Sequence, residues 1–249
     1  MKATVYSVEG KALKQIDLPD VFEFPRREDL VKRAVLSEES KTYQPKGSYK
    51  LAGLETSARY RGRKDDFGSG KNKGISHLPH EVLPKGQLGK VKRVPHAVKG
   101  RRAHPPKTQK KIVELMNSKE YKRALASAIS FTADRETVCA RVHSDIGVSI
   151  PIVLEDKFEK LEKTKEVVAL LNLLNLSGFI KKAKKNNTKS TLFVVSNGAN
   201  TKVGANIAGV DIVQVKDLKV CDLAPGTHPG RLTLFSERAL PDIVKRFGL

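Results

Sequence analysis

The feature that most constrains this chain is a run of 71 residues, Lys41 to Lys111, without a regular hydrophobic pattern. It holds 19 basic and 4 acidic residues, nine of the 18 glycines and six of the 12 prolines. Its net charge of +15 leaves only +5 for the other 178 residues. Irregular stretches this long are uncommon inside a compact domain unless they are functional or serve as disordered linkers. The chain therefore reads as a nearly balanced globular protein interrupted by one cationic insertion.

The overall composition indicates a folded body and a polyanionic partner. Hydrophobic residues make up 39% of the 249, enough for a packed core, while the net charge is +20 and the pI about 9.9. An excess of this size speaks to partners rather than to fold. No apolar run approaches the roughly 18 residues of a membrane span, and the start, MKATVYSVEGK, lacks an apolar signal core. We expect a cytoplasmic protein with no membrane partner.

Aromatic residues interleaved with the cations distinguish the segment from a passive linker. Aromatic faces and guanidinium planes stack on unpaired bases, and cations neutralise phosphate. Glycines let the backbone approach a phosphate closely. We therefore expect the segment to be mobile alone and to become ordered on RNA. The residues that suggest this are Tyr43, Tyr49, Tyr60 and Phe67, with Arg59, Arg61, Arg63 and Lys64, and Gly68, Gly70 and Gly74.

The remaining sequence predicts one α/β domain. Short continuous apolar strands separated by helices indicate a mainly parallel sheet covered on both faces. The fold class is thus a single three-layer α/β domain, residues 1–40 and 112–249, interrupted by a long extended basic loop, residues 41–111. Strands are expected at Ala3–Val8, Lys14–Leu18, Ile150–Glu155, Thr191–Ser196, Val210–Val215 and Arg231–Ser236. Helices are expected at Arg27–Ser40, in two segments of Lys107–Asp134 broken near Asn117, at Lys163–Leu174, near Asn200 and at Glu237–Phe247.

The motifs that could carry chemistry are weak. The stretch FGSGKNKG approaches the phosphate-loop pattern GxxxxGK[ST], but Asp65 and Asn72 occupy two of its required positions. His77, His80 and Glu81 are in the order HxxHE, which matches neither zinc-protease motif. Cys139 and Cys221 stand alone and are expected to be buried free thiols. We expect no catalytic residue, no metal site and no cofactor.

Two further patches stay open between a structural and a binding role. The run KKAKK, residues 181–185, is either the end of a surface helix or an additional phosphate contact. The loop LAPGTHPGR, residues 223–231, is either a connection between strands or a contact to RNA or protein.

Several strings closely resemble the large-subunit ribosomal protein of the L-four family. They are FGSG at 67–70, VPHAVKGRRAHPPK at 94–107 and KRALASAISFTAD at 122–134. The segment DLAPGTHPGRLTLFSERAL, residues 222–240, is similar to the C-terminal signature of the archaeal branch of that family. The resemblance covers essentially the whole chain in the right order.

This resemblance implies a structural role in the large ribosomal subunit, in assembly and rRNA binding. The globular domain would lie on the subunit surface, and the loop would run through the rRNA to the peptide exit tunnel. The tip, Tyr60–Lys73, would lie near the nascent peptide and expose Arg61, Arg63, Lys64 and Lys71, although Asp65 and Asp66 make it less basic than is common in relatives. Neighbouring ribosomal proteins would be further partners.

Residue chemistry and resemblance together give one set of expected RNA contacts, of which Arg93–Lys107 would form the returning arm. The full set is Lys46, Arg59, Tyr60, Arg61, Arg63, Lys64, Phe67, Gly68, Gly70, Lys71, Lys73, His77, Lys90, Lys92, Arg93, His96, Lys99, Arg101, Arg102, His104 and Lys107.

Three other functions remain to be tested. A DNA-binding or chromatin protein would need a basic recognition helix, whereas here the charge lies on an irregular loop. A nucleotide-dependent RNA enzyme would bind ATP or GTP. A soluble α/β domain with a disordered insert would stay open to proteases even with rRNA present.

Overall fold

The computed structural model describes residues 1–186 and 188–248. It divides into two compact units, which are treated separately below. The first, here called the body, comprises Met1–Thr42 and Val113–Leu249, and the second, here called the insert, comprises Tyr43–Ile112.

The body is built on a six-stranded sheet with the strand order β2-β1-β5-β8-β6-β7. The strands β1 and β2 form an antiparallel hairpin, and every other pairing in the sheet is parallel. This confirms the predicted α/β class with a mainly parallel sheet. The strands are β1 (Lys2–Tyr6), β2 (Ala12–Asp17), β5 (Ile152–Leu154), β6 (Thr191–Val195), β7 (Asp211–Gln214) and β8 (Leu232–Ser236).

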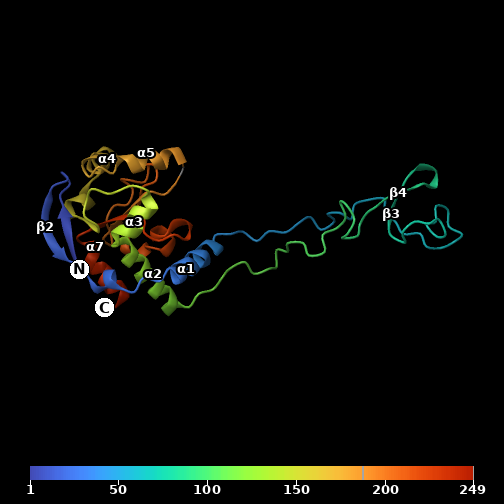
Figure 1. The fold of residues 1–249 in the computed structure, drawn as a ribbon, viewed down its shortest axis with the longest axis horizontal. Coiled ribbons are helices and arrows are strands. Elements are labelled where there is room, and N and C mark those ends of the chain that lie inside the picture. Colours follow the sequence, from blue (N-terminus) through green and yellow to red (C-terminus); the bar gives the residue numbers. More distant parts are fainter. Residues whose placement is uncertain (187, 249) are drawn as a thin grey trace. The chain divides into compact units, whose positions relative to one another are not determined.

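The central strands β5, β6 and β8 are buried on both faces, whereas the edge strand β2 is mostly exposed. Alternate residues of a strand point to opposite sides of the sheet. Leu192 and Val194 of β6 join one core, while Phe193 and Val195 join the other. The first core lies under α1 (Glu28–Ser40), α2 (Ser118–Thr132), α6 (Val220–Leu223) and α7 (Ala239–Phe247). The second lies under α3 (Arg135–Val142), α4 (Thr164–Leu173) and α5 (Ser177–Asn186). Figure 1 shows α4 and α5 on the side of the body opposite to α2 and α7.

The prediction of a helix before Asn117 is wrong. Residues 107–117 are irregular, and the side chain of Leu115 is 82% exposed. Within the body, α1 holds the backbone of Glu114 in this stretch: the amide of Glu114 donates to Ser40 Oγ at 2.9 Å, and Ser37 Oγ donates to the Glu114 carbonyl at 2.7 Å. These side chains satisfy backbone groups that a helix would have paired internally.

The predicted short helix near Asn200 is also wrong. Residues 197–209, between β6 and β7, consist of turns and bends. Gly198 has a φ of 96°, which an α-helix does not allow. The connection therefore returns the chain to β7 without a regular covering helix. Short 3-10 turns lie at Asp20–Glu23, Pro84–Gly86, Asp156–Lys160, Val215–Asp217 and Pro225–Thr227.

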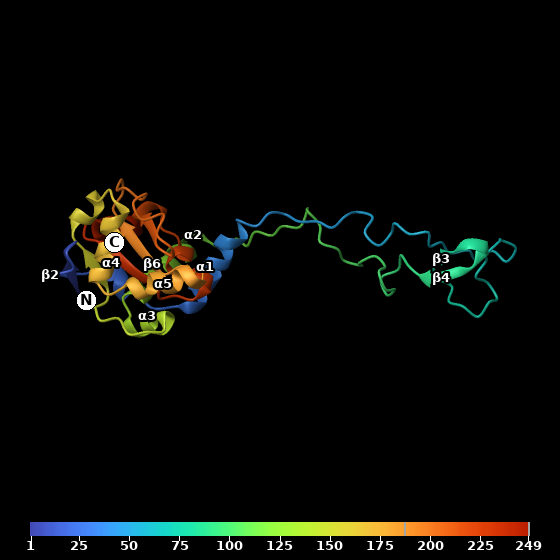
Figure 2. The ribbon, with the colours of Figure 1, turned by 90° about the horizontal axis from the view of Figure 1, so that it is seen from above.

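The insert contains a small antiparallel hairpin that the sequence did not predict. It pairs β3 (His80–Val82) with β4 (Leu88–Val91), as Figure 2 shows, and Arg59 bridges to His80. Elsewhere in the insert, the Ser48 amide donates to the Pro106 carbonyl at 3.3 Å. The stretch that leads to the hairpin and the stretch that follows it therefore contact each other directly at this point. That the insert is mobile until RNA orders it stays a prediction.

Candidate nucleic-acid interface

The cations of the insert face solvent and have few internal partners. Of the 19 cations in residues 41–111, Lys92 alone forms an ion pair with a residue that the structure describes. Most expected contact residues are exposed: Lys46, Arg59, Tyr60, Arg63, Lys64, Phe67, Lys71, Lys73, His77, Lys90, Arg93, His96, Lys99, Arg101, Arg102, His104 and Lys107. Arg61, Gly68, Gly70 and Lys92 are partly buried. The surface thus holds many positive charges available to a polyanion.

Lys92 is placed differently from its neighbours. Its side chain is 13% exposed, and its Nζ lies 3.9 Å from Glu81 Oε1 across the hairpin. The next residue, Arg93, has a φ of 70° and donates from Nη1 to the Ala58 carbonyl at 3.3 Å. Lys92 therefore links the two sides of the hairpin, and Arg93 ties the hairpin to the stretch before it.

Arg61 corrects the expectation that all four tip cations are exposed. Its side chain is partly buried, and Nη1 donates to the Phe67 carbonyl at 2.5 Å. Its own carbonyl accepts the amide of Gly70 at 3.1 Å. These bonds close residues 61–70 into a loop, since a guanidinium can satisfy carbonyls that irregular backbone leaves unpaired. Arg63, Lys64 and Lys71 are exposed as predicted.

Aromatic rings lie on the surface of the same loop. Phe67 is 76% exposed and Tyr60 is 52% exposed, far more than aromatic side chains in a packed core. The Tyr60 and His77 rings lie side by side, with centroids 6.2 Å apart. Exposed rings beside unpaired cations are what single-stranded bases and their phosphates require.

His80 of the HxxHE stretch contacts backbone groups of the hairpin and its flank. His80 lies in β3, with Nδ1 2.9 Å from the Gly89 carbonyl oxygen and Nε2 3.0 Å from that of Ser76. Both ring nitrogens therefore contact backbone carbonyls and hold the hairpin together. Among residues 1–186 and 188–248, no cluster of three or more His, Cys, Asp or Glu side chains is arranged to hold a metal.

The two cysteines of the body are free but only half-buried, so the prediction of buried thiols is wrong in degree. Cys221 lies at the start of α6 beside the first core, and burial raises the pKa of its thiol to about 12. Such a thiol stays protonated at neutral pH and is a poor nucleophile.

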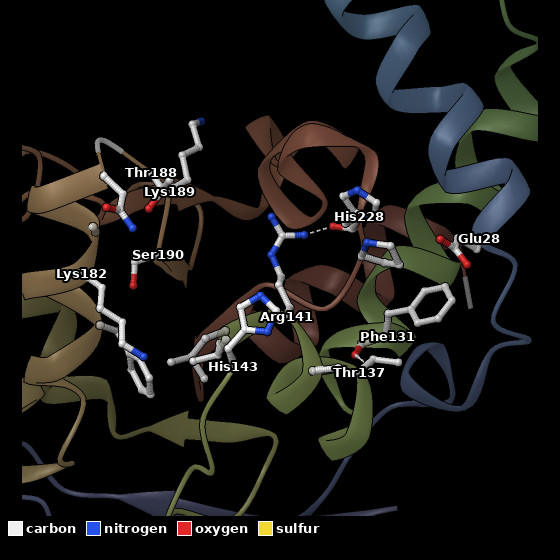
Figure 3. A pocket seen from close by; sticks show the side chains of 17 residues that line it. Glu28, Phe131, Thr137, Arg141, His143, Lys182, Thr188, Lys189, Ser190 and His228 are labelled. Carbon is white, nitrogen blue, oxygen red and sulfur yellow. Dashed lines mark hydrogen bonds between the residues drawn. The ribbon is translucent and has the colours of Figure 1, made fainter.

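The body carries a cavity of about 730 Å³ that the sequence did not single out. Its walls come from the start of α1, the end of α2, α3 and α5, and from the chain before β6 and before β8. Figure 3 shows Lys182 and Ser190 on one side of it, with Arg141 and His228 on the other. The cavity thus brings together residues from both patches whose roles were left open, Lys182 and Ala183 from the first and His228 and Pro229 from the second. Arg141 was missed because α3, with its weak amphipathic pattern, was not predicted.

No helix among the described residues is both long and apolar enough to cross a membrane.

Comparison with known proteins gives a consistent match along the chain. The model of a family described as the ribosomal protein L4/L1 family matches residues 16–246. A protein of Haloarcula marismortui named large ribosomal subunit protein uL4 is 40% identical over 261 residues, which cover 99% of this chain and 100% of the relative. Its namesake in Methanocaldococcus jannaschii is 41% identical over 264 residues, with the same coverage. The one in Methanospirillum hungatei is 37% identical over 263 residues, covering 100% of this chain and 99% of the relative.

Proposed function

The chain belongs to the ribosomal protein L4/L1 family, and from that premise we propose that it is a structural constituent of the large ribosomal subunit. The similar proteins are archaeal and carry the name of a large-subunit protein. The family consists of ribosomal proteins rather than enzymes, which agrees with the prediction that the chain is not an enzyme.

Within that role, the insert binds large-subunit rRNA. The observation that carries this proposal is the excess of exposed cations: among the described residues, one ion pair accounts for a single cation of the 19. Binding of phosphates releases condensed counterions, so affinity falls steeply with salt. Exposed rings such as Phe67 and Tyr60 add stacking on unpaired bases, which favours irregular RNA over a duplex.

The resemblance extends the proposal to the position of the tip. Residues 60–73 would lie at the wall of the peptide exit tunnel, with Arg63, Lys64 and Lys71 near the nascent peptide. Neighbouring large-subunit proteins would contact the rest of the chain, which would act in the cytoplasm, bound to the ribosome. The closed loop formed by Arg61 supports a tip of defined shape, because its bonds to Phe67 and Gly70 restrict the backbone between them.

The salt dependence of rRNA binding tests the proposal. Replacing Arg101 and Arg102 with alanine in the full chain is expected to weaken binding and to lower the slope of log affinity against log salt by roughly 1–2, about one phosphate for each arginine. Both side chains are exposed, so the fold is expected to be unchanged.

The matched control replaces Lys163 and Lys165, two exposed lysines of the body, with alanine and removes the same charge. Equal slopes for the two double variants would mean that net charge alone drives binding. Equal affinity of the unaltered chain for duplex DNA and rRNA at the same salt would contradict an RNA-specific role.

A further inference from the structure

The cavity of the body has an apolar floor and a cationic rim. Leu232 and Ala183 are almost fully buried beneath it, and the rings of Phe131 and Phe179 contribute to its wall. Its volume of about 730 Å³ lies within the roughly 300–1,000 Å³ typical of small-ligand sites. A site of this kind suits a ligand with one flat apolar part and one anionic part.

Arg141 supplies the first cation of the rim. It is half-buried at the end of α3, and it donates to the backbone carbonyls of Pro225, at 2.8 Å from Nη2, and His228. No carboxylate among the described residues forms an ion pair with it. Burial, and then the charge of nearby Arg231, lower its pKa to about 10. A half-buried cation without a counter-charge is costly, and an anionic ligand would offset that cost.

Lys182 supplies the second cation, on the opposite wall. Its Nζ lies 5.9 Å from the centre of the Phe179 ring, one turn earlier in α5. Lys189 also lines the cavity, but its Nζ lies 3.4 Å from Asp211 Oδ2 and is therefore already paired. Glu28 is the acidic residue of the lining, and His143 and His228 are exposed at its edge.

We propose that this cavity binds a single unstacked nucleotide of large-subunit rRNA, with its base against the Phe179 ring and its phosphate between Arg141 and Lys182. This inference rests on the proposed function but concerns a second contact, on the body rather than on the insert. A base and its phosphate combine the flat apolar part and the anion that the cavity accommodates. Unstacked bases are commonly bound on aromatic rings beside cations.

Photo-crosslinking tests the position of the contact. The full chain is bound to transcribed large-subunit rRNA that contains 4-thiouridine, irradiated, and digested for mass spectrometry. We expect nucleotide adducts on the peptides that contain Phe179 or His228, in addition to adducts within residues 43–112. Adducts confined to the insert would overturn this inference and leave the proposed function intact, whereas absence of any rRNA binding would overturn both.

A matched pair of variants tests the chemistry. Lys182→Gln is expected to lower the salt slope by about 0.7–0.9, one phosphate contact. Lys184→Gln removes the same charge from an exposed position of α5 outside the cavity, and its slope is expected to stay unchanged. Phe179→Leu keeps an apolar side chain but loses the ring, and it is expected to weaken binding about tenfold.

Equal slopes for Lys182→Gln and Lys184→Gln would overturn the proposal. Free AMP, GMP, CMP and UMP distinguish the source of the nucleotide. They are expected to bind weakly, at millimolar concentration, because the cavity grips only one unit of a longer chain. Saturation by a free nucleotide at micromolar concentration, without cavity adducts from rRNA, would make this a small-molecule site and would overturn the RNA assignment.

Discussion

Burial decides what each arginine of the body does. Arg231, the residue before β8, has a fully buried side chain whose Nη2 lies 2.7 Å from Asp211 Oδ2 and 3.0 Å from the Thr191 carbonyl oxygen. It therefore ties three neighbouring strands together from inside the fold. Arg238 pairs with Asp156 at 2.9 Å, but its side chain is 57% exposed, so water competes for the same bond.

Replacing Arg231 with methionine is expected to cost about 3–5 kcal/mol of unfolding free energy, because several carbonyls lose their donor and Asp211 keeps only Lys189 as a cationic partner. The matched change Arg238→Met is expected to cost less than about 1 kcal/mol. Urea unfolding monitored by circular dichroism measures both. Similar losses for the two variants would mean that Arg231 is not the internal tie that its contacts indicate.

Glu155 makes the stability of the body depend on pH in the acidic range. Its carboxylate accepts the Val8 amide at 3.0 Å and the Ser7 hydroxyl at 3.0 Å. The Val8 hydrogen bond is the main cause that lowers the pKa of this carboxyl below its ordinary value of 4.5. Since the folded state holds the ionised form, this stabilisation is present above about pH 4.5 and is lost as the pH falls through the lower folded pKa.

Glu155→Gln is therefore expected to be less stable than the original chain at neutral pH, and the difference is expected to shrink as the pH falls below about 4.5. Urea unfolding between pH 3 and 7 measures the gap. Glu162→Gln, at an exposed carboxylate, serves as the control. A gap that stays constant with pH would show that the Val8 and Ser7 bonds do not depend on the charge.

The residue types of the insert predicted an exposed cationic surface. They did not predict which of its cations would instead bond to other groups of the insert. Arg63 and Lys64 are exposed as expected, whereas Arg61 turns inward to the Phe67 carbonyl and Lys92 approaches Glu81. Those partners depend on how the loop and the hairpin fold. A count of cations carries no such information.

At the scale of elements, the strands were predictable and the weakly patterned helices were not. Continuous apolar runs such as TLFVV identify buried parallel strands, and β6 forms where one was expected. A helix was expected before Asn117, but residues 107–117 are irregular, and Ser37 and Ser40 of α1 bond the backbone of Glu114. The short helix α3 was missed because its residues lack a clear apolar stripe. It carries Arg141, so the cavity was missed with it.

The turn before β7 offers a test at the same scale. Gly209 has a φ of 75°, and a Cβ built there would lie 2.4 Å from Ala183 Cβ in α5. Gly226 has a φ of 72° but nothing within 4 Å of such a Cβ. Gly226→Ala is expected to cost about 1–2 kcal/mol from backbone strain alone, and Gly209→Ala to cost clearly more because helix and turn must separate. Thermal unfolding measures both, and equal shifts would show that α5 does not pack tightly here.

At the scale of the whole molecule, we expect the body to fold without the insert. Ser37 and Ser40 of α1 contact Glu114, so the two chain ends that flank the insert are already held together inside the body. Replacing residues 43–112 with a short Gly-Ser linker is expected to leave one cooperative thermal transition within a few degrees of the original, and to abolish most rRNA affinity.

A smaller deletion separates the tip from the rest. Removing residues 60–73 is expected to leave the thermal transition of the body in place and to preserve docking on rRNA, while altering passage of nascent peptide through the tunnel. Differential scanning calorimetry and filter binding measure the first two. Loss of the calorimetric transition would show that the tip belongs to the core of the body.

The serine contacts to Glu114 also bear on how the length of the insert can change during evolution. Once both ends of a flexible excursion are fixed, doubling its length costs only about 0.6 kcal/mol in closure entropy. Residues gained or lost between Ser40 and Glu114 would therefore change the free energy of unfolding of the body very little. Selection on how far the excursion must reach could then adjust its size from lineage to lineage, with the α/β scaffold left as it is.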